Sequence, residues 1–126
     1  MNLVSTRIIT SDVKQLVQFY EQITSLTAVH YTEDFAKLVT PTAALAIGST
    51  RTLQFFGGDT VAQAAQNRSV IVEFQFDNVD DVYEKIELFI EPYLVHQPKT
   101  MPWGNRSLLF RDPDGNLVNF FTIVTQ

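Results

Sequence analysis

An amphipathic pattern that occurs twice is the feature that most constrains how this chain can fold. Four apolar positions with i, i+3, i+4, i+7 spacing recur at an offset of 66: Val13, Leu16, Val17 and Tyr20, then Val79, Val82, Tyr83 and Ile86. Each set follows an extended stretch, at residues 6–10 and 70–76, and a short polar step. Asp12 and Asn78 in those steps carry side-chain oxygens that can cap a helix. The chain is therefore predicted to contain two copies of one module.

Each module is predicted to be one strand, one helix and three further strands. In the first copy the helix is expected to end near Ile23, and in the second near Phe89, before Pro92. The later strands are expected at residues 35–40, 43–48 and 52–56 and at residues 93–96, 107–111 and 117–124. We assign residues 1–58 to the first module, 59–68 to a connector and 69–126 to the second.

Length and composition narrow the classes of protein to consider. With 126 residues, of which 45% are hydrophobic, one compact domain over 1–126 is expected. The chain has no cysteine, so it offers no disulfide and no thiolate metal ligand. A net charge of −5 without a cluster of Lys or Arg argues against nucleic acid and anionic membranes as partners. No signal-peptide pattern and no membrane-length apolar run is present, so we expect a cytoplasmic protein.

Residues 110–116, Phe-Arg-Asp-Pro-Asp-Gly-Asn, predict a tight turn between two strands. Pro113 fixes φ at the start of the turn, and Gly115 accepts a positive φ. Together with the duplicated module and the preceding Met-Pro-Trp-Gly at 101–104, this turn resembles the vicinal oxygen chelate superfamily. That superfamily includes glyoxalase I, bleomycin-resistance proteins and extradiol dioxygenases. The resemblance implies an α+β fold in which two tandem βαβββ modules form a curved sheet or half-barrel groove.

The resemblance also implies where a catalytic metal would bind. Metal-using members place His or Gln on the first strand of a module and Glu on its last strand. Those positions correspond here to Ser5, Ile71 and Asn119, with the remaining position at about residues 53–56. Because neutral Ser and Asn cannot replace the hydration of a divalent ion, and Ile71 has no donor, we predict no metal. Metal-dependent lyase or dioxygenase chemistry therefore loses support.

The two histidines do not change this prediction. His30 and His96 also lie 66 positions apart, away from the expected ligand positions, and a strand-end or surface role is predicted for them. No other cofactor is expected. An enzyme remains an alternative, either with metal ligands placed elsewhere or with Glu73 as a metal-free acid or base.

Strand alternation predicts which side chains line the groove. Ser5, Arg7 and Ile9 should face it from the first module, and Ile71, Glu73 and Gln75 from the second. Arg7 and Glu73 are expected to approach each other. They would form a structural ion pair, or Arg7 would bind an anionic group of a ligand while Glu73 orients the guanidinium.

Aromatic residues supply the other predicted walls of the groove. Phe56 and Phe121 are expected to face inward, whereas Phe120 should lie beneath a helix. Trp103 either offers an exposed stacking surface or covers a strand edge.

The sequence thus predicts a metal-free protein that sequesters a planar or aromatic organic ligand, most like the bleomycin-resistance branch, as a homodimer. The predicted ligand-binding residues are Arg7, Glu73, Gln75, Phe56, Trp103, Asn119 and Phe121. The acidic composition would suit a cationic ligand. A regulatory or assembly protein with an inert groove is the third alternative.

Overall fold

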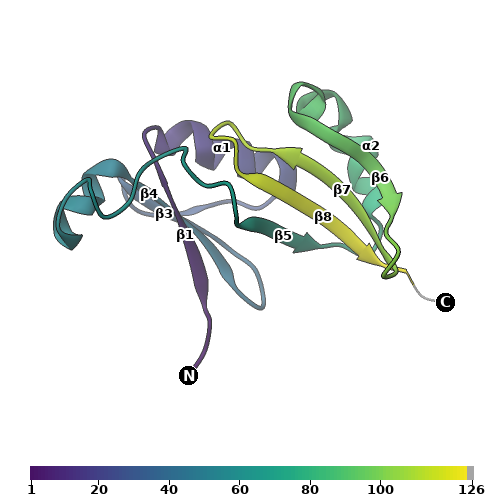
Figure 1. Cartoon of the computed structure of the whole chain (residues 1–126), viewed down its shortest axis with the longest axis horizontal. Helices are drawn as coiled ribbons and strands as arrows, with labels where there is room; N and C mark the ends of the chain where they lie inside the picture. The colour runs from purple at the N-terminus through teal and green to yellow at the C-terminus, as the bar shows by residue number, and fades with distance from the viewer. Residues whose placement is uncertain (125–126) are drawn as a thin grey trace. The chain divides into compact units, whose positions relative to one another are not determined.

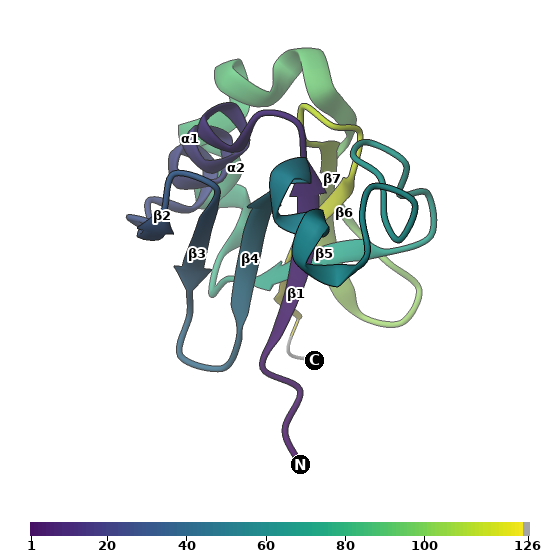
Figure 2. The same cartoon turned by 90° about the vertical axis from the view of Figure 1, so that its left-hand side faces the viewer.

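A computed structural model describes residues 1–124, which fall into two compact units: unit 1 over Met1–Gln66 and unit 2 over 67–124 (Figure 1). The elements of unit 1 are β1 (Ser5–Thr10), α1 (Val13–Thr24), β2 (Val29–Thr32), β3 (Phe35–Val39), β4 (Ala44–Ser49) and the 3-10 helix η1 (Thr50–Phe56). Its strands lie in the order β1-β4-β3-β2, with β1 parallel to β4 and the other pairs antiparallel (Figure 2). The first strand of the unit is thus hydrogen-bonded to its last.

Helix α1 forms where the repeated pattern predicts it. The Asp12 side chain accepts a hydrogen bond from the backbone N–H of Gln15 at 3.0 Å, which caps the first turn. At the other end Ser25 adopts a left-handed conformation, and its N–H donates to the Glu21 carbonyl. The apolar stripe packs on one face of the sheet, and its buried residues are Val13, Leu16, Val17, Phe19, Tyr20 and Ile23.

Unit 2 repeats this topology. Its elements are β5 (Ile71–Gln75), α2 (Val79–Ile90), the short 3-10 helix η2 (Glu91–Tyr93), β6 (Leu94–Thr100), β7 (Asn105–Arg111) and β8 (Leu117–Ile123). The strand order is β5-β8-β7-β6, again with the first and last strands parallel. The predicted α+β class and the two tandem βαβββ modules are therefore confirmed. Within residues 1–124, neither helix has the length and apolar content needed to cross a lipid bilayer.

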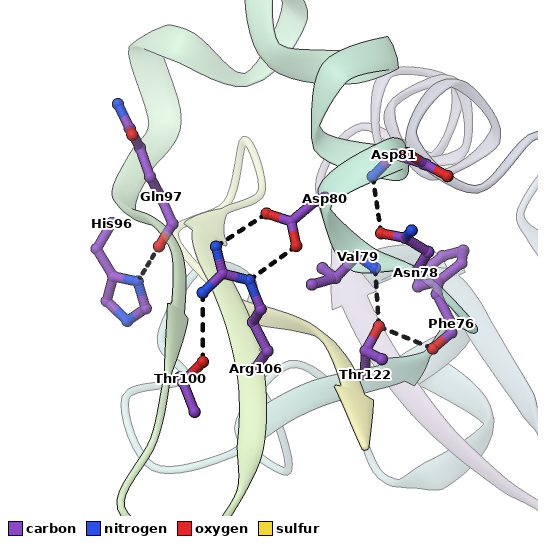
Figure 3. A network of polar contacts seen from close by, with 10 residues as sticks. All are labelled: Phe76, Asn78, Val79, Asp80, Asp81, His96, Gln97, Thr100, Arg106 and Thr122. Carbon is purple, nitrogen blue, oxygen red and sulfur yellow. Dashed lines mark hydrogen bonds and ion pairs between the residues drawn. The ribbon is translucent and has the colours of Figure 1, made fainter. Parts of the chain in front are cut away.

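The core of unit 2 is built around Phe120, which is fully buried on β8. The rings of Phe74, Phe76 and Phe110 lie 4.6–5.5 Å from its ring centroid. Close by, the hydroxyl of Thr122 accepts from the N–H of Val79 and donates to the carbonyl of Phe76 (Figure 3). This single side chain ties the start of α2 to strands β5 and β8. Phe120 thus lies on the helix side of the sheet, as the alternation predicts.

One strand prediction in unit 1 is wrong, and one strand of that unit was not predicted. Residues 52–56 form η1 instead of a strand because residue 49 starts a helical turn. The Ser49 hydroxyl accepts from the N–H of Arg51 at 3.1 Å, and the Thr52 hydroxyl donates to the Ser49 carbonyl at 2.7 Å. The unit obtains its fourth strand from β2, a four-residue segment that is exposed throughout and that the sequence analysis does not predict.

The predicted turn at residues 110–116 is confirmed. Asp112 is only 2% exposed, and its carboxylate accepts from the backbone N–H groups of Asp114 and Asn116 and from the Asn116 side chain. Gly115 has φ +84°, which an L side chain rarely adopts. The turn holds β7 and β8 in antiparallel register.

Candidate functional site

In unit 1, two cations and three aromatic rings gather on the sheet face opposite α1. We call this set the cation–aromatic cluster, and its members are Arg7, Tyr31, Phe35, Lys37 and Phe56. The Arg7 guanidinium lies 4.5 Å from the ring centroid of Phe35 and 5.7 Å from that of Phe56. Lys37 Nζ lies 5.8 Å from the Phe35 centroid and 5.6 Å from that of Tyr31. Two positive charges thus share the Phe35 ring.

Small residues form the floor of the cluster. Ala46 on β4 is in register with Arg7 on one side and Lys37 on the other, so only a methyl group separates the two cations across the sheet. A methyl group at Gly48 would lie 3.5 Å from Arg7 Cδ and 3.3 Å from the Thr52 hydroxyl. The Arg7 side chain therefore lies flat over Gly48, and η1 covers the same end of the strand.

Neither cation of the cluster has a carboxylate partner within the described part of unit 1. The ion pair in that unit joins Arg51 to Asp34, with Nη2 to Oδ1 at 2.6 Å. Hydrogen bonding from Arg51 holds the pKa of Asp34 below its usual value, with help from Ser49. The charges of Arg7 and Lys37 are thus left to interact with the rings and with solvent.

Unit 2 presents hydrogen-bond acceptors on the corresponding face of its sheet. Glu73 and Asn119 are in register, and Asn119 Nδ2 donates to Glu73 Oε2 at 2.8 Å. Asn119 is 9% exposed, and its Oδ1 is buried with no hydrogen-bond partner in residues 1–124. Gln75 and Phe121 are paired further along the same two strands. Four of the predicted ligand residues therefore lie on one face of unit 2.

Trp103 stands on the loop between β6 and β7. Two backbone hydrogen bonds close this loop, from Met101 N–H to the Asn105 carbonyl and from Gly104 N–H to the Met101 carbonyl. Gly104 has φ +101°, which suits this tight loop. The Trp103 side chain is 73% exposed, so its ring is accessible from solvent. This agrees with either of the two roles predicted for it.

The family model for the glyoxalase-like domain matches residues 3–122 of this sequence. The chain belongs to the glyoxalase-like family. The prediction of the vicinal oxygen chelate superfamily is thereby confirmed.

Solved structures with the same fold include several glyoxalase relatives. A glyoxalase/bleomycin resistance protein/dioxygenase family enzyme from Burkholderia phytofirmans PsJN is 15% identical, with TM-score 0.85 over 98% of this chain and 100% of its own. A glyoxalase/bleomycin resistance protein/dioxygenase from Nocardioides is 21% identical, with TM-score 0.79 over 98% of this chain and 84% of its own. A glyoxalase-related enzyme from Fulvimarina pelagi is 14% identical, with TM-score 0.80 over 97% of this chain and 88% of its own. These likenesses show the fold alone. A comparison with curated proteins found none that matches.

The strand register corrects one of the metal-ligand positions expected for a glyoxalase-like chain. Because β4 is the last strand of unit 1, the counterpart of Asn119 is Ala46 and not a residue in 53–56: Arg7 pairs with Ala46 as Glu73 pairs with Asn119. A methyl group cannot coordinate a metal. With a hydroxyl at Ser5 and an alkyl chain at Ile71, these positions do not fit a divalent ion.

Other polar groups of unit 2 have structural roles. Arg106 binds Asp80 through two hydrogen bonds of 2.7 and 3.0 Å and also donates to Thr100 (Figure 3). This pairing with Arg106 lowers the pKa of Asp80. His96 Nδ1 lies 2.8 Å from the Gln97 carbonyl on β6. The other histidine, His30, belongs to unit 1 and is exposed on β2. No group of three or more metal-ligating side chains occurs in residues 1–124.

Sequence reasoning missed three members of the cation–aromatic cluster: Tyr31, Phe35 and Lys37. A signal existed for two of them, because a strand at 35–39 with Ala36 and Leu38 buried must turn Phe35 and Lys37 to the other face. Tyr31 was missed because its strand is only four residues long and was not among the predicted elements. Phe56 was predicted from the wrong element, since it lies on η1 and not on a strand.

Proposed function

We propose that this protein binds a planar or aromatic small organic molecule without using a metal. The observation that carries the proposal is the position of Arg7, whose guanidinium lies over Phe35 with the exposed ring of Phe56 beside it. Such a wall suits a flat ligand, because rings and guanidinium planes stack at little cost in conformational entropy. Glu73, Gln75, Asn119, Phe121 and Trp103 of unit 2 remain ligand-binding residues predicted from the sequence. The mechanism is sequestration, in which burial holds the ligand and no bond is broken.

The donor chemistry at the expected metal positions supports the metal-free part of this proposal. Ser5, Ala46, Ile71 and Asn119 together contain no imidazole and no carboxylate. An ion bound there would lose water molecules without gaining comparable ligands. A homodimer and a cytoplasmic location remain predictions from the sequence.

Ligand binding is tested by titrating the protein with planar aromatic compounds while recording ¹H–¹⁵N correlation spectra. We expect saturable shifts at Arg7 and at its neighbours on β1, and weaker binding by a Phe56→Ala variant. Phe55→Ala is the matched control, because Phe55 is 79% exposed on the same 3-10 helix. Equal losses in both variants, or no saturable shift at all, would contradict the proposal.

Trp103 can be followed separately because it is the only tryptophan of the chain. If it forms part of the ligand-binding surface, its fluorescence changes along the same binding curve as the spectral shifts at Arg7. If it covers a strand edge, its fluorescence stays constant while those shifts saturate.

The metal-free part is tested by stripping the protein with a chelator and adding Ni²⁺, Zn²⁺, Mn²⁺ or Fe²⁺ while measuring the melting temperature and the bound metal. We expect no stoichiometric metal and no rise in melting temperature. A tightly bound ion that raises the melting temperature would overturn this part and restore the alternative of a metal-dependent enzyme.

A further inference from the structure

We propose that the ligand bound by the cation–aromatic cluster of unit 1 is an aromatic carboxylate. This inference rests on the proposed function and adds the charge and chemical class of the ligand. It also replaces the expectation, drawn from the acidic composition, that a cationic ligand would suit the protein.

The first argument is the uncompensated charge of the cluster. Arg7 and Lys37 lie over the same ring, that of Phe35, although like charges that share a small region repel each other. The ion pair of unit 1 involves Arg51 and Asp34 instead. A carboxylate at the cluster would interact favourably with both cations and relieve their mutual repulsion.

The second argument is that the surroundings of the cations contain no acidic group on the same sheet face. The other residues on that face of β1, β3 and β4 are Ser5, Ile9, Val39, Ala44, Ala46 and Gly48. A cationic ligand would find no counter-charge on this part of unit 1, whereas an anion meets two positive side chains. The sign of the local charge is therefore opposite to that of the whole chain, which is −5.

The third argument concerns the rings, which set the shape of the rest of the ligand. Tyr31 is stacked on Phe35 at 5.4 Å with an interplanar angle of 29°, and Tyr31 and Phe56 are 56% and 60% exposed. Exposed ring surface beside two cations suits a molecule with a flat apolar part next to its anionic group. Ala46 and Gly48 contribute almost no side-chain bulk between the two cations, and Arg7 is itself exposed, so an anion can reach its guanidinium.

The test uses three probes with the same ring system and different head groups: 2-naphthoate, 2-naphthamide and 2-naphthylmethylamine. Binding of each to the full chain is measured by ¹H–¹⁵N correlation spectra at low and high salt. We expect 2-naphthoate to bind about tenfold more tightly than the neutral amide, and the amine to bind most weakly. Raising the ionic strength should weaken binding of the carboxylate and leave binding of the amide unchanged.

Two variants locate the effect in the cluster. Lys37→Gln and Arg7→Gln should each reduce the affinity for 2-naphthoate about fivefold or more, and should reduce it by a larger factor than the affinity for 2-naphthamide. Lys14→Gln on the exposed side of α1 is the matched control, since it removes the same charge from another surface. If Arg7→Gln disturbs the sheet, Lys37→Gln still decides the question, because Lys37 is not part of the parallel pair β1–β4.

The outcomes separate the inference from the proposed function. If the amide or the amine binds as tightly as the carboxylate, or if Lys14→Gln weakens carboxylate binding as much as Lys37→Gln, the ligand class is wrong while ligand binding stands. If none of the three probes binds, both the inference and the proposal of a stacking surface are overturned.

Discussion

The two units share one topology but carry different side chains on the sheet face opposite the helix. Each unit places its first strand beside its last, and each has a twelve-residue helix capped by Asp12 or Asn78. The face opposite the helix is cationic and aromatic in unit 1, where Arg7 and Lys37 meet Phe35. In unit 2 it carries the acceptors of Glu73 and Asn119. The repeated backbone pattern therefore determines which residues share a face, while the individual residues determine what that face can bind.

The largest expected effect concerns the core of unit 2. Phe120→Ala removes a fully buried ring that three other phenylalanines contact, so it should lower the free energy of unfolding by about 3–5 kcal/mol. Urea unfolding measures this loss. Phe55→Ala removes the same side chain from an exposed position of unit 1 and should cost less than about 0.5 kcal/mol. Similar losses in the two variants would contradict the assignment of Phe120 to the core.

The next largest loss of stability is expected in the turn between the last two strands of each unit. This turn is held by a buried carboxylate in unit 2 and by an exposed hydroxyl in unit 1. Asp112→Ala leaves two backbone N–H groups and the Asn116 amide without their acceptor and should cost about 2–3 kcal/mol. In unit 1, the Thr40 hydroxyl donates to Ala43 in an exposed turn, so Thr40→Ala should cost about 1 kcal/mol or less. Thermal unfolding of both variants tests this order. A larger loss for Thr40→Ala would contradict the conclusion that the Asp112 turn contributes more to stability than the turn at Thr40.

The ends of the two helices offer a smaller comparison. Ser25 after α1 has φ +62°, so Ser25→Gly should raise the free energy of unfolding by about 0.5–1 kcal/mol. Glu91 after α2 is right-handed, with φ −47°, so Glu91→Gly should reduce stability instead. Chemical denaturation of the two variants should give shifts of opposite sign, and shifts of the same sign would count against this difference.

The smallest effect concerns the surface ion pairs. Arg106 reaches both carboxylate oxygens of Asp80, while both contacts of Arg51 go to one oxygen of Asp34. Asp80→Asn should therefore cost about 0.5–1 kcal/mol at pH 7 and Asp34→Asn less. The pKa of Asp80 is lowered by Arg106, so its contribution is complete above the unfolded pKa of about 3.9 and is lost as the pH falls through the lower folded pKa. Melting curves from pH 7 to pH 3 measure this, and a difference between Asp80→Asn and wild type that stays constant as the pH falls would contradict it.

The sequence predicted the parts of the fold that are recorded in periodic patterns. Both helices follow from apolar spacing and their caps from Asp12 and Asn78, while the turn at Asp112 follows from Pro113 and Gly115. The strand β2 was not predicted because it is only four residues long, and so short an alternation of apolar and polar residues does not distinguish a strand from a loop. The segment at 52–56 is predicted as a strand, and Phe55 and Phe56 do favour extended structure, yet side-chain hydrogen bonds at Ser49 and Thr52 start a helical turn.

The candidate site was predictable only in part for the same reason. Counting along the chain located Arg7, Glu73 and Asn119 correctly on their strands, but the first-module counterpart of Asn119 depended on knowing which strand pairs with β1. That pairing is a long-range contact, and no local pattern encodes it. Ala46 could therefore be identified as the counterpart of Asn119 only from the strand register.

Each sheet is formed only by strands of its own unit, and this arrangement has an evolutionary consequence. Ser5 pairs with Ala44 and Ile71 with Leu117, so the backbone ladder of each sheet is completed by residues of its own copy. After duplication of a module of this kind, substitutions on the open face of one copy need not disturb the strand register of the other. The two faces can then diverge independently, which is how one ancestral module can yield a positively charged surface in one descendant and an acceptor surface in the other.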